Sequence, residues 1–187
     1  MDGISASDAD LLLRARQGEE AAFVQIYQRY RRSVFQFAWR LTGSEAAAED
    51  VTQECFLALL DGAAYDPQHG ALRTYLLGIA RHRAIRRVRA LERDSEDTED
   101  APDTIDPLGE LLAAERTEMV CRAVATLPLP QREALVLFEY EELSMEEIAE
   151  VTGVEVGAVK SRLFRARESL RKRLAPLLSA AAARSSG

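Results

Sequence analysis

Residues 144–167 read Ser-Met-Glu-Glu-Ile-Ala-Glu-Val-Thr-Gly-Val-Glu-Val-Gly-Ala-Val-Lys-Ser-Arg-Leu-Phe-Arg-Ala-Arg, a pattern that predicts two helices joined by a tight turn. Ser144 and Glu147 match a capping box at the start of the first helix. Gly153 supplies a residue that can adopt a left-handed conformation, so the chain can change direction sharply there. The second helix has basic residues on its outer side, and a helix-turn-helix of this kind is typical of DNA-binding proteins.

The helix predicted after this turn has an apolar face and a polar face. Its apolar residues recur every three or four positions, which indicates packing against a core: Val156, Val159, Leu163, Ala166, Leu170 and Leu174. On the polar side, Arg and Lys can donate hydrogen bonds to guanine in the major groove, and an aromatic ring can contact a thymine methyl group. The side chains that point away from the apolar face or flank it are therefore predicted to bind DNA: Lys160, Ser161, Arg162, Phe164 and Arg165.

A second basic helix is predicted near the middle of the chain, from about residue 71 to residue 91. Its apolar residues gather on one arc of the helix, and basic residues occupy the opposite arc. Surface helices usually mix acidic with basic side chains, but no acidic residue occurs between Gln68 and Leu91. This pattern favours nucleic-acid contact over a solvated face, and we predict that the contact involves His82, Arg83, Arg86 and Arg87.

Acidic residues are concentrated between the two basic helices. Of the formal net charge of −7, residues 91–110 carry −8, from nine acidic residues and one arginine, so the rest of the chain carries +1. Apolar residues are sparse in this segment, and Pro102 and Pro107 interrupt any helix. The composition predicts a solvated, flexible linker. It also suggests the hypothesis that the linker covers the two basic helices when the protein is free of partners.

The rest of the chain has helical patterns, and no segment alternates apolar and polar residues as a half-buried strand does. Asp8 is predicted to cap the first helix, Gly43 to end the second and Ser44 to cap the third. We therefore predict an all-α fold, in which two small helical domains are joined by the acidic linker and the second contains the helix-turn-helix. The predicted boundaries are 1–91 for the N-terminal domain, 92–115 for the linker, 116–178 for the C-terminal domain and 179–187 for a disordered tail.

The sequence lacks the features of membrane proteins, secreted proteins and the common enzyme classes. No run of about 18 apolar residues occurs and the N-terminus has no secretory signal, so we expect a cytoplasmic protein without membrane insertion. Cys55, Cys121, His69 and His82 do not have the spacing of metal ligands, which predicts no metal and no other cofactor. Because no phosphate-binding loop, acid-base pair or nucleophile triad occurs, we expect no catalytic residues and no small-molecule substrate.

Three motifs give the chain a resemblance to a known family: residues 48–56 (AEDVTQECF), residues 65–76 followed by 79–85, and residues 157–167 (GAVKSRLFRAR). In this order and spacing they resemble the extracytoplasmic-function (ECF) group of bacterial RNA polymerase sigma factors. The resemblance covers about residues 8–91 and 117–178. It implies a sigma factor that directs RNA polymerase to specific promoters and helps to open the DNA at transcription initiation.

The resemblance also implies a role for each part of the chain. In similar proteins the first domain recognises the minus-ten promoter element and the second domain recognises the minus-thirty-five element. A polar helix side that corresponds here to Asp50, Gln53 and Glu54 docks on the RNA polymerase core. The loop from Tyr65 to Gly70 aligns with family residues around an extruded base, so Tyr65 either stacks on that base or is a core aromatic. The expected partners are the RNA polymerase core, promoter DNA and an inhibitory anti-sigma factor, which is common in this group.

Two alternative functions are considered for the same patterns. A stand-alone transcriptional regulator with a LuxR-like helix-turn-helix explains residues 144–167, but it gives no role to residues 48–56 or to the basic helix at 81–89. A protein-binding helical adaptor treats both basic helices as solvated surfaces. Dependence of promoter recognition on RNA polymerase distinguishes the sigma factor from both alternatives.

Overall fold

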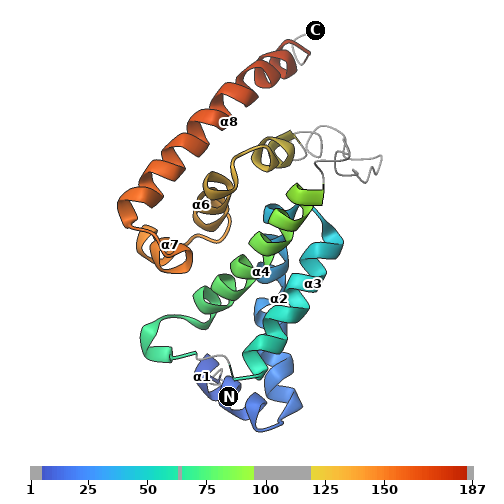
Figure 1. Ribbon diagram of the computed structural model, residues 1–187, viewed down its shortest axis with the longest axis vertical. Coiled ribbons are helices and arrows are strands. Elements are labelled where there is room, and N and C mark those ends of the chain that lie inside the picture. The colour runs from blue at the N-terminus through green and yellow to red at the C-terminus, as the bar shows by residue number, and fades with distance from the viewer. Residues whose placement is uncertain (1–5, 63–64, 95–118, 185–187) are drawn as a thin grey trace. The chain divides into compact units, whose positions relative to one another are not determined.

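The computed structural model describes residues 6–62, 65–94 and 119–184, and the chain divides into two compact units, Met1–Thr98 and Glu99–Gly187. Regular structure within the described residues consists of helices, so the predicted all-α fold is confirmed (Figure 1). Most of the predicted acidic linker lies outside the described residues. The two units are described separately below.

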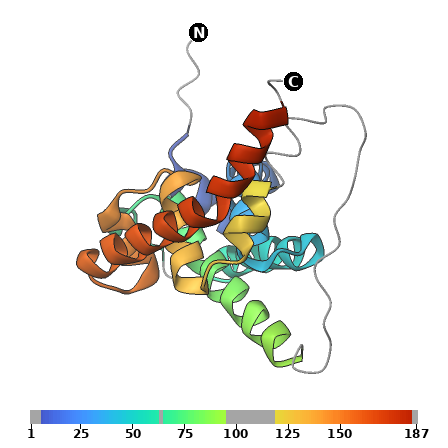
Figure 2. The same cartoon turned by 90° about the horizontal axis from the view of Figure 1, so that it is seen from above.

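The first unit is built around one long helix, residues 20–42, which contacts the other three α-helices of the unit. It contains α1 (Asp8–Arg16), α2 (Glu20–Thr42), α3 (Glu45–Leu60), the short 3₁₀ helix η1 (Pro67–His69) and α4 (Leu72–Asp94). Helix α2 packs against α1, α3 and α4, and α3 also packs against α4 (Figures 1 and 2). The core between them is apolar and fully buried, with its largest side chains being Leu11, Ile26, Phe37, Leu41, Leu59, Leu72, Leu76 and Leu77. This packing determines which sides of α3 and α4 face away from the core.

The helix ends of the first unit follow the sequence signals, with one correction. Ser44 caps α3, because its Oγ accepts a hydrogen bond from the Ala47 amide at 3.3 Å. Gly43 ends α2 in a left-handed conformation with φ of 70°. The prediction that Asp8 caps the first helix is wrong, since Ser7 Oγ accepts from the Asp10 amide instead. Asp8 is the first helical residue, and its carboxylate accepts hydrogen bonds from two α2 side chains, those of Arg29 and Tyr30.

The second unit contains the predicted helix-turn-helix. Residues 119–125 are helical and are followed by α6 (Leu129–Glu139), α7 (Met145–Thr152) and α8 (Val156–Arg184). The capping box at the start of α7 is confirmed, with the Ser144 and Glu147 side chains each bonded to the other residue's amide. Gly153 is left-handed, with φ of 68°, as the turn into α8 requires. Helix α8 packs on α6 and α7 through the buried residues Val159, Leu163 and Ala166.

Two helices extend beyond the limits predicted from the sequence. Helix α4 continues to Asp94, three residues past the predicted end of the first domain. Helix α8 continues to Arg184, so the predicted disordered tail is wrong for residues 179–184. The reason is that residues 180–183 are four alanines, the residue with the strongest intrinsic helix propensity. Residues 185–187 lie outside the described residues.

Candidate nucleic-acid interface

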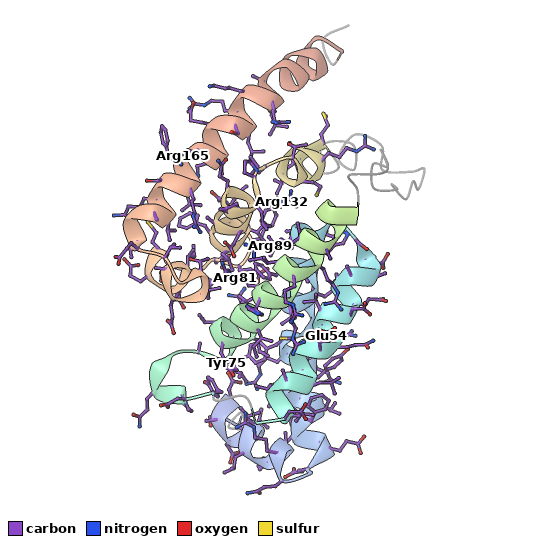
Figure 3. All side chains as sticks on the ribbon, in the orientation of Figure 1. Glu54, Tyr75, Arg81, Arg89, Arg132 and Arg165 are labelled. Atoms are coloured by element: carbon purple, nitrogen blue, oxygen red, sulfur yellow. The ribbon has the colours of Figure 1, made fainter. Side chains whose placement is uncertain are left out.

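Helix α8 presents four of its five predicted DNA-binding residues on its outer side. Lys160, Ser161, Phe164 and Arg165 are all exposed, and Figure 3 labels Arg165 on this helix. Phe164 is 67% exposed, which is unusual for a phenylalanine in a small helical unit. The buried residues on the opposite side of α8 hold these four side chains outward. The resulting surface combines positive charge with an exposed aromatic ring, the combination that suits base and phosphate contact in a major groove.

Arg162 does not point away from the rest of the unit as predicted, because its side chain reaches toward α6. Its Nη1 lies 3.7 Å from Oε2 of Glu133 on α6, and the Glu133 side chain is only 2% exposed. Arg167, which also faces α6, donates to Glu139 at 2.7 Å and lies over the Phe138 ring. The helical wheel of α8 alone missed this arrangement, since a buried carboxylate on α6 was not expected from its apolar pattern. Two arginines of α8 therefore attach the helix to α6.

The four predicted DNA-binding residues of α4 separate into two pairs. His82 and Arg86 are exposed, whereas Arg83 and Arg87 lie against α3. Arg83 Nη1 donates to Oε2 of Glu54 at 2.5 Å, and Arg87 Nη2 donates to Oε1 of the same carboxylate at 2.6 Å. Arg83 and Arg87, which were predicted to contact nucleic acid, are thus paired with an acid of α3 in this structure. The wheel of α4 contained no acid, and the counter-charge comes from α3.

The contact with two arginines changes the titration of Glu54. Hydrogen bonding to Arg87 is the largest effect and holds the pKa of this carboxyl below its ordinary value of 4.5; burial opposes it, and hydrogen bonding to Arg83 lowers the pKa further. Asp50 also approaches Arg87, at 3.4 Å. The charged form of Glu54 is thus stabilised by the fold.

The lowered pKa of Glu54 predicts a pH dependence of stability. A carboxyl with a lowered folded pKa stabilises the fold above its unfolded pKa, and this contribution is lost as the pH falls through the folded value. We expect the difference in free energy of unfolding between the parent and Glu54→Gln to be constant at neutral pH and to shrink below about pH 4.5. Urea unfolding at a series of pH values measures this difference. Parallel curves in the acid range would contradict the prediction.

The outer side of α3 carries the residues predicted to bind polymerase. Asp50 and Gln53 are exposed. Glu54, which is labelled in Figure 3, is partly exposed and pairs with α4. The next turn adds Leu57, which is 59% exposed and was not predicted to belong to this surface. A hollow of about 420 Å³ lies at this point, lined by Glu54, Leu57, Ala58, Asp61 and Arg83. The available signal was that Leu57 is a large apolar residue outside the buried stripe of α3.

Tyr65 lies in the loop before α4 and packs against the first turns of that helix. Its hydroxyl donates to the Gly70 carbonyl at 3.2 Å, and its ring centroid is 5.4 Å from that of Tyr75. Burial raises the pKa of the Tyr65 hydroxyl, although the side chain is only partly buried. The Tyr65 ring therefore lies at the edge of the core, where it packs against the Tyr75 ring.

Two further sequence predictions bear on cofactors and membranes. Within the described residues, no group of three or more His, Cys, Asp and Glu side chains is placed to hold a metal ion. Cys55 is buried, its thiol donates to the Leu76 carbonyl at 3.3 Å, and burial raises its pKa to about 12. None of the described helices is long and apolar enough to cross a membrane.

Comparison with known proteins assigns both units to one group. The family models described as Sigma-70 region 2 and Sigma-70, region 4 match residues 26–94 and 117–170, respectively. The ECF RNA polymerase sigma factor SigW of Bacillus subtilis is 30% identical over 178 residues, which cover 88% of this chain and 95% of that protein. The RNA polymerase sigma-H factor of Pseudomonas aeruginosa is 34% identical over 91% of this chain and 95% of its own length.

Solved structures agree with this assignment. The sigma factor RpoE of Bartonella quintana, in complex with the anti-sigma factor NepR, is 26% identical, covers 81% of this chain and has a TM-score of 0.67; 96% of its own chain is matched. CnrH, in complex with the cytosolic domain of CnrY, has the same identity and TM-score over 94% of this chain and 99% of its own. A stand-alone LuxR-like regulator does not account for the match of the first unit. The chain therefore belongs to the ECF RNA polymerase sigma factors and acts in transcription initiation.

Proposed function

We propose that α3 is the surface through which this sigma factor binds the RNA polymerase core. The proposal rests on the exposed, polar side of α3, where Asp50, Gln53 and Glu54 match the family motif for docking. Leu57 lies one turn further along the same side and is 59% exposed. An apolar side chain surrounded by acidic and amide groups is the composition expected of a protein-binding surface with a cationic partner.

The basic faces of the two units are proposed to bind the two promoter elements. In the second unit Lys160, Ser161, Phe164 and Arg165 enter the major groove of the minus-thirty-five element, and Arg162 supports them by holding α8 on α6. In the first unit His82 and Arg86 contact the minus-ten element, and Tyr65, in the loop before the same helix, contacts an extruded base. The observation that carries this proposal is that α4 and α8 expose basic side chains on one side, while Arg83 and Arg87 of α4 and Arg167 of α8 pair with acids of neighbouring helices.

The division of the chain supports the proposed domain roles. The boundary between the compact units falls at residues 98 and 99, inside the segment 92–115 that the sequence marks as a linker. We propose an N-terminal domain for polymerase and minus-ten binding and a C-terminal domain, 116–178, for the minus-thirty-five element. The hypothesis that the acidic linker covers the basic helices concerns residues outside those described.

The protein is proposed to act by binding alone, in the cytoplasm, with no catalytic group of its own. Strand opening then comes from trapping of unpaired bases, a process that needs no hydrolysis. Because the solved relatives RpoE and CnrH were captured with an anti-sigma factor and with the cytosolic domain of CnrY, an anti-sigma factor is proposed as the regulator of this chain.

Run-off transcription tests the proposed function directly. With core polymerase and a genomic promoter library, we expect specific transcripts that appear only when this protein is added. Omission of the protein and omission of the polymerase are the two controls. Tight, selective binding to operator DNA without polymerase would instead support a stand-alone regulator, and the absence of specific transcripts together with no association with the polymerase would support a protein-binding adaptor.

A further inference from the structure

The Glu54 carboxylate is bound by two arginines whose donor groups have the chemistry of a phosphate-binding site. The two guanidinium groups come from positions 83 and 87, one helical turn apart on α4, so that they lie side by side. Each donates to a different oxygen of the Glu54 carboxylate, at 2.5 Å and 2.6 Å. Guanidinium groups bind carboxylate and phosphate oxygens through the same planar donor geometry. The carboxylate thus occupies a position whose donor geometry also suits a phosphate group.

The two arginines are accessible enough for a phosphate group to replace the Glu54 carboxylate. The side chains of Arg83, Arg87 and Glu54 are 31%, 26% and 39% exposed, so all three lie at the surface between α3 and α4. Ion pairs at such positions are screened by water and contribute little to stability. Replacement of the carboxylate by a phosphate group therefore costs little free energy. The exposed His82 and Arg86 continue the basic surface next to them. A nucleic-acid strand bound on α4 would therefore pass close to the two arginines.

Negative charge on α3 keeps phosphate away from this pair in the free protein. Besides Glu54, Asp50 lies 3.4 Å from Arg87 and is itself 63% exposed, so two carboxylates face the arginines. Both of these acids also belong to the proposed polymerase-binding surface. A cationic side chain of a partner that pairs with them would cancel the charge that now competes with phosphate. The same two carboxylates would then be shared between polymerase docking and DNA binding.

We propose that Arg83 and Arg87 form a latent phosphate-binding site for single-stranded DNA, blocked by Glu54 in the free protein and opened when a cationic surface of the polymerase engages Glu54 and Asp50. This inference rests on the proposed polymerase docking of α3. It assigns Glu54 a second role, as an internal competitor of the DNA backbone. It also explains why two basic residues of the DNA-binding helix face an acidic helix.

The salt dependence of DNA binding tests the blocked site. The full-length free protein is titrated with fluorescein-labelled single-stranded DNA at several salt concentrations, and the slope of log K against log[salt] is measured. Each additional contact to a single-strand phosphate steepens this slope by about 0.7. Glu54→Gln is expected to steepen it by roughly 1.4, because two arginines become available. Circular dichroism checks that the variant remains helical.

Glu49→Gln is the matched control. Glu49 is exposed on the same helix, and its replacement removes the same charge without releasing Arg83 or Arg87. We expect the parent slope for Glu49→Gln, and again for the triple variant Glu54→Gln, Arg83→Gln, Arg87→Gln. Equal slopes for the Glu54 and Glu49 variants would overturn the inference, since they would show an effect of net charge only.

A second measurement covers the case in which Glu54→Gln does not fold. The double variant Arg83→Gln, Arg87→Gln should bind single-stranded DNA with the parent slope as the free protein, but should reduce open-complex formation at least several-fold when assembled with polymerase. A shallower slope for the free double variant would show that the site is already open and would overturn the inference. Polymerase binding, measured separately by co-migration, distinguishes failure of docking from failure of the latent site.

Discussion

Replacement of Arg165 with Ala is expected to lower initiation about 5- to 150-fold at promoters that depend on a minus-thirty-five element. The guanidinium is exposed on the outer side of α8, beside the exposed ring of Phe164, and no described contact engages it inside the unit. A good bidentate contact of Arg with guanine provides about 1–3 kcal/mol of discrimination, which corresponds to that range of rates. Run-off transcription on paired templates, with and without the element, measures the effect.

Arg173→Ala provides the matched control for this experiment. It removes the same side chain from an exposed position about two turns further along α8, beyond the predicted DNA-binding residues. We expect it to change initiation only slightly and to the same extent on both templates. If Arg165→Ala lowered transcription equally from both templates, Arg165 would be acting through general electrostatics, and its assignment to the minus-thirty-five element would be wrong.

Leu41→Ala is expected to destabilise the first unit by about 2–5 kcal/mol. Leu41 lies near the end of α2, the helix that contacts α1, α3 and α4, and its side chain is fully buried. The substitution removes apolar burial and leaves a cavity that the surrounding helices can fill only in part. Since small domains have total stabilities of only about 5–15 kcal/mol, a loss of this size is a large fraction of the whole. Urea unfolding followed by circular dichroism measures it.

Leu13→Ala makes the same chemical change at an exposed position. Leu13 is on α1 and is 58% exposed, so its truncation leaves no internal cavity. We expect a change within about 0.5 kcal/mol, as for most surface substitutions. Similar destabilisation by the two variants would mean that Leu13 is buried in solution by a contact outside the described residues.

The helical architecture was predictable because its signals are local. Ser44, Gly43, Gly153 and the Ser144 capping box each determine a helix end through the hydrogen bonding of residues within one turn. The error at Asp8 was a displacement of one residue, between two neighbouring side chains that are both good helix caps. The run of alanines at 180–183 was interpreted from its position near the end of the chain, and its helix propensity was underestimated.

The candidate site was only partly predictable because its ion pairs join different helices. A helical wheel shows which residues of one helix share a side, and it identified His82, Arg86, Ser161 and Arg165 as outward-facing. It contains no information on the neighbouring helix. The pairing of Arg83 and Arg87 with Glu54, and that of Arg162 with Glu133, depends on how α3 packs on α4 and how α6 packs on α8.

The attachment of Arg162 to the buried Glu133 separates the residues that support α8 from those that face outward. Under the proposed binding of α8 to the minus-thirty-five element, attempts to give this protein a new promoter preference can vary positions 160, 161, 164 and 165, which are all solvent-facing. Position 162 should be kept constant in such a library, because its loss would leave a carboxylate that is 2% exposed without this cationic neighbour. Designed variants that follow this division should keep the scaffold intact while their target sequence changes.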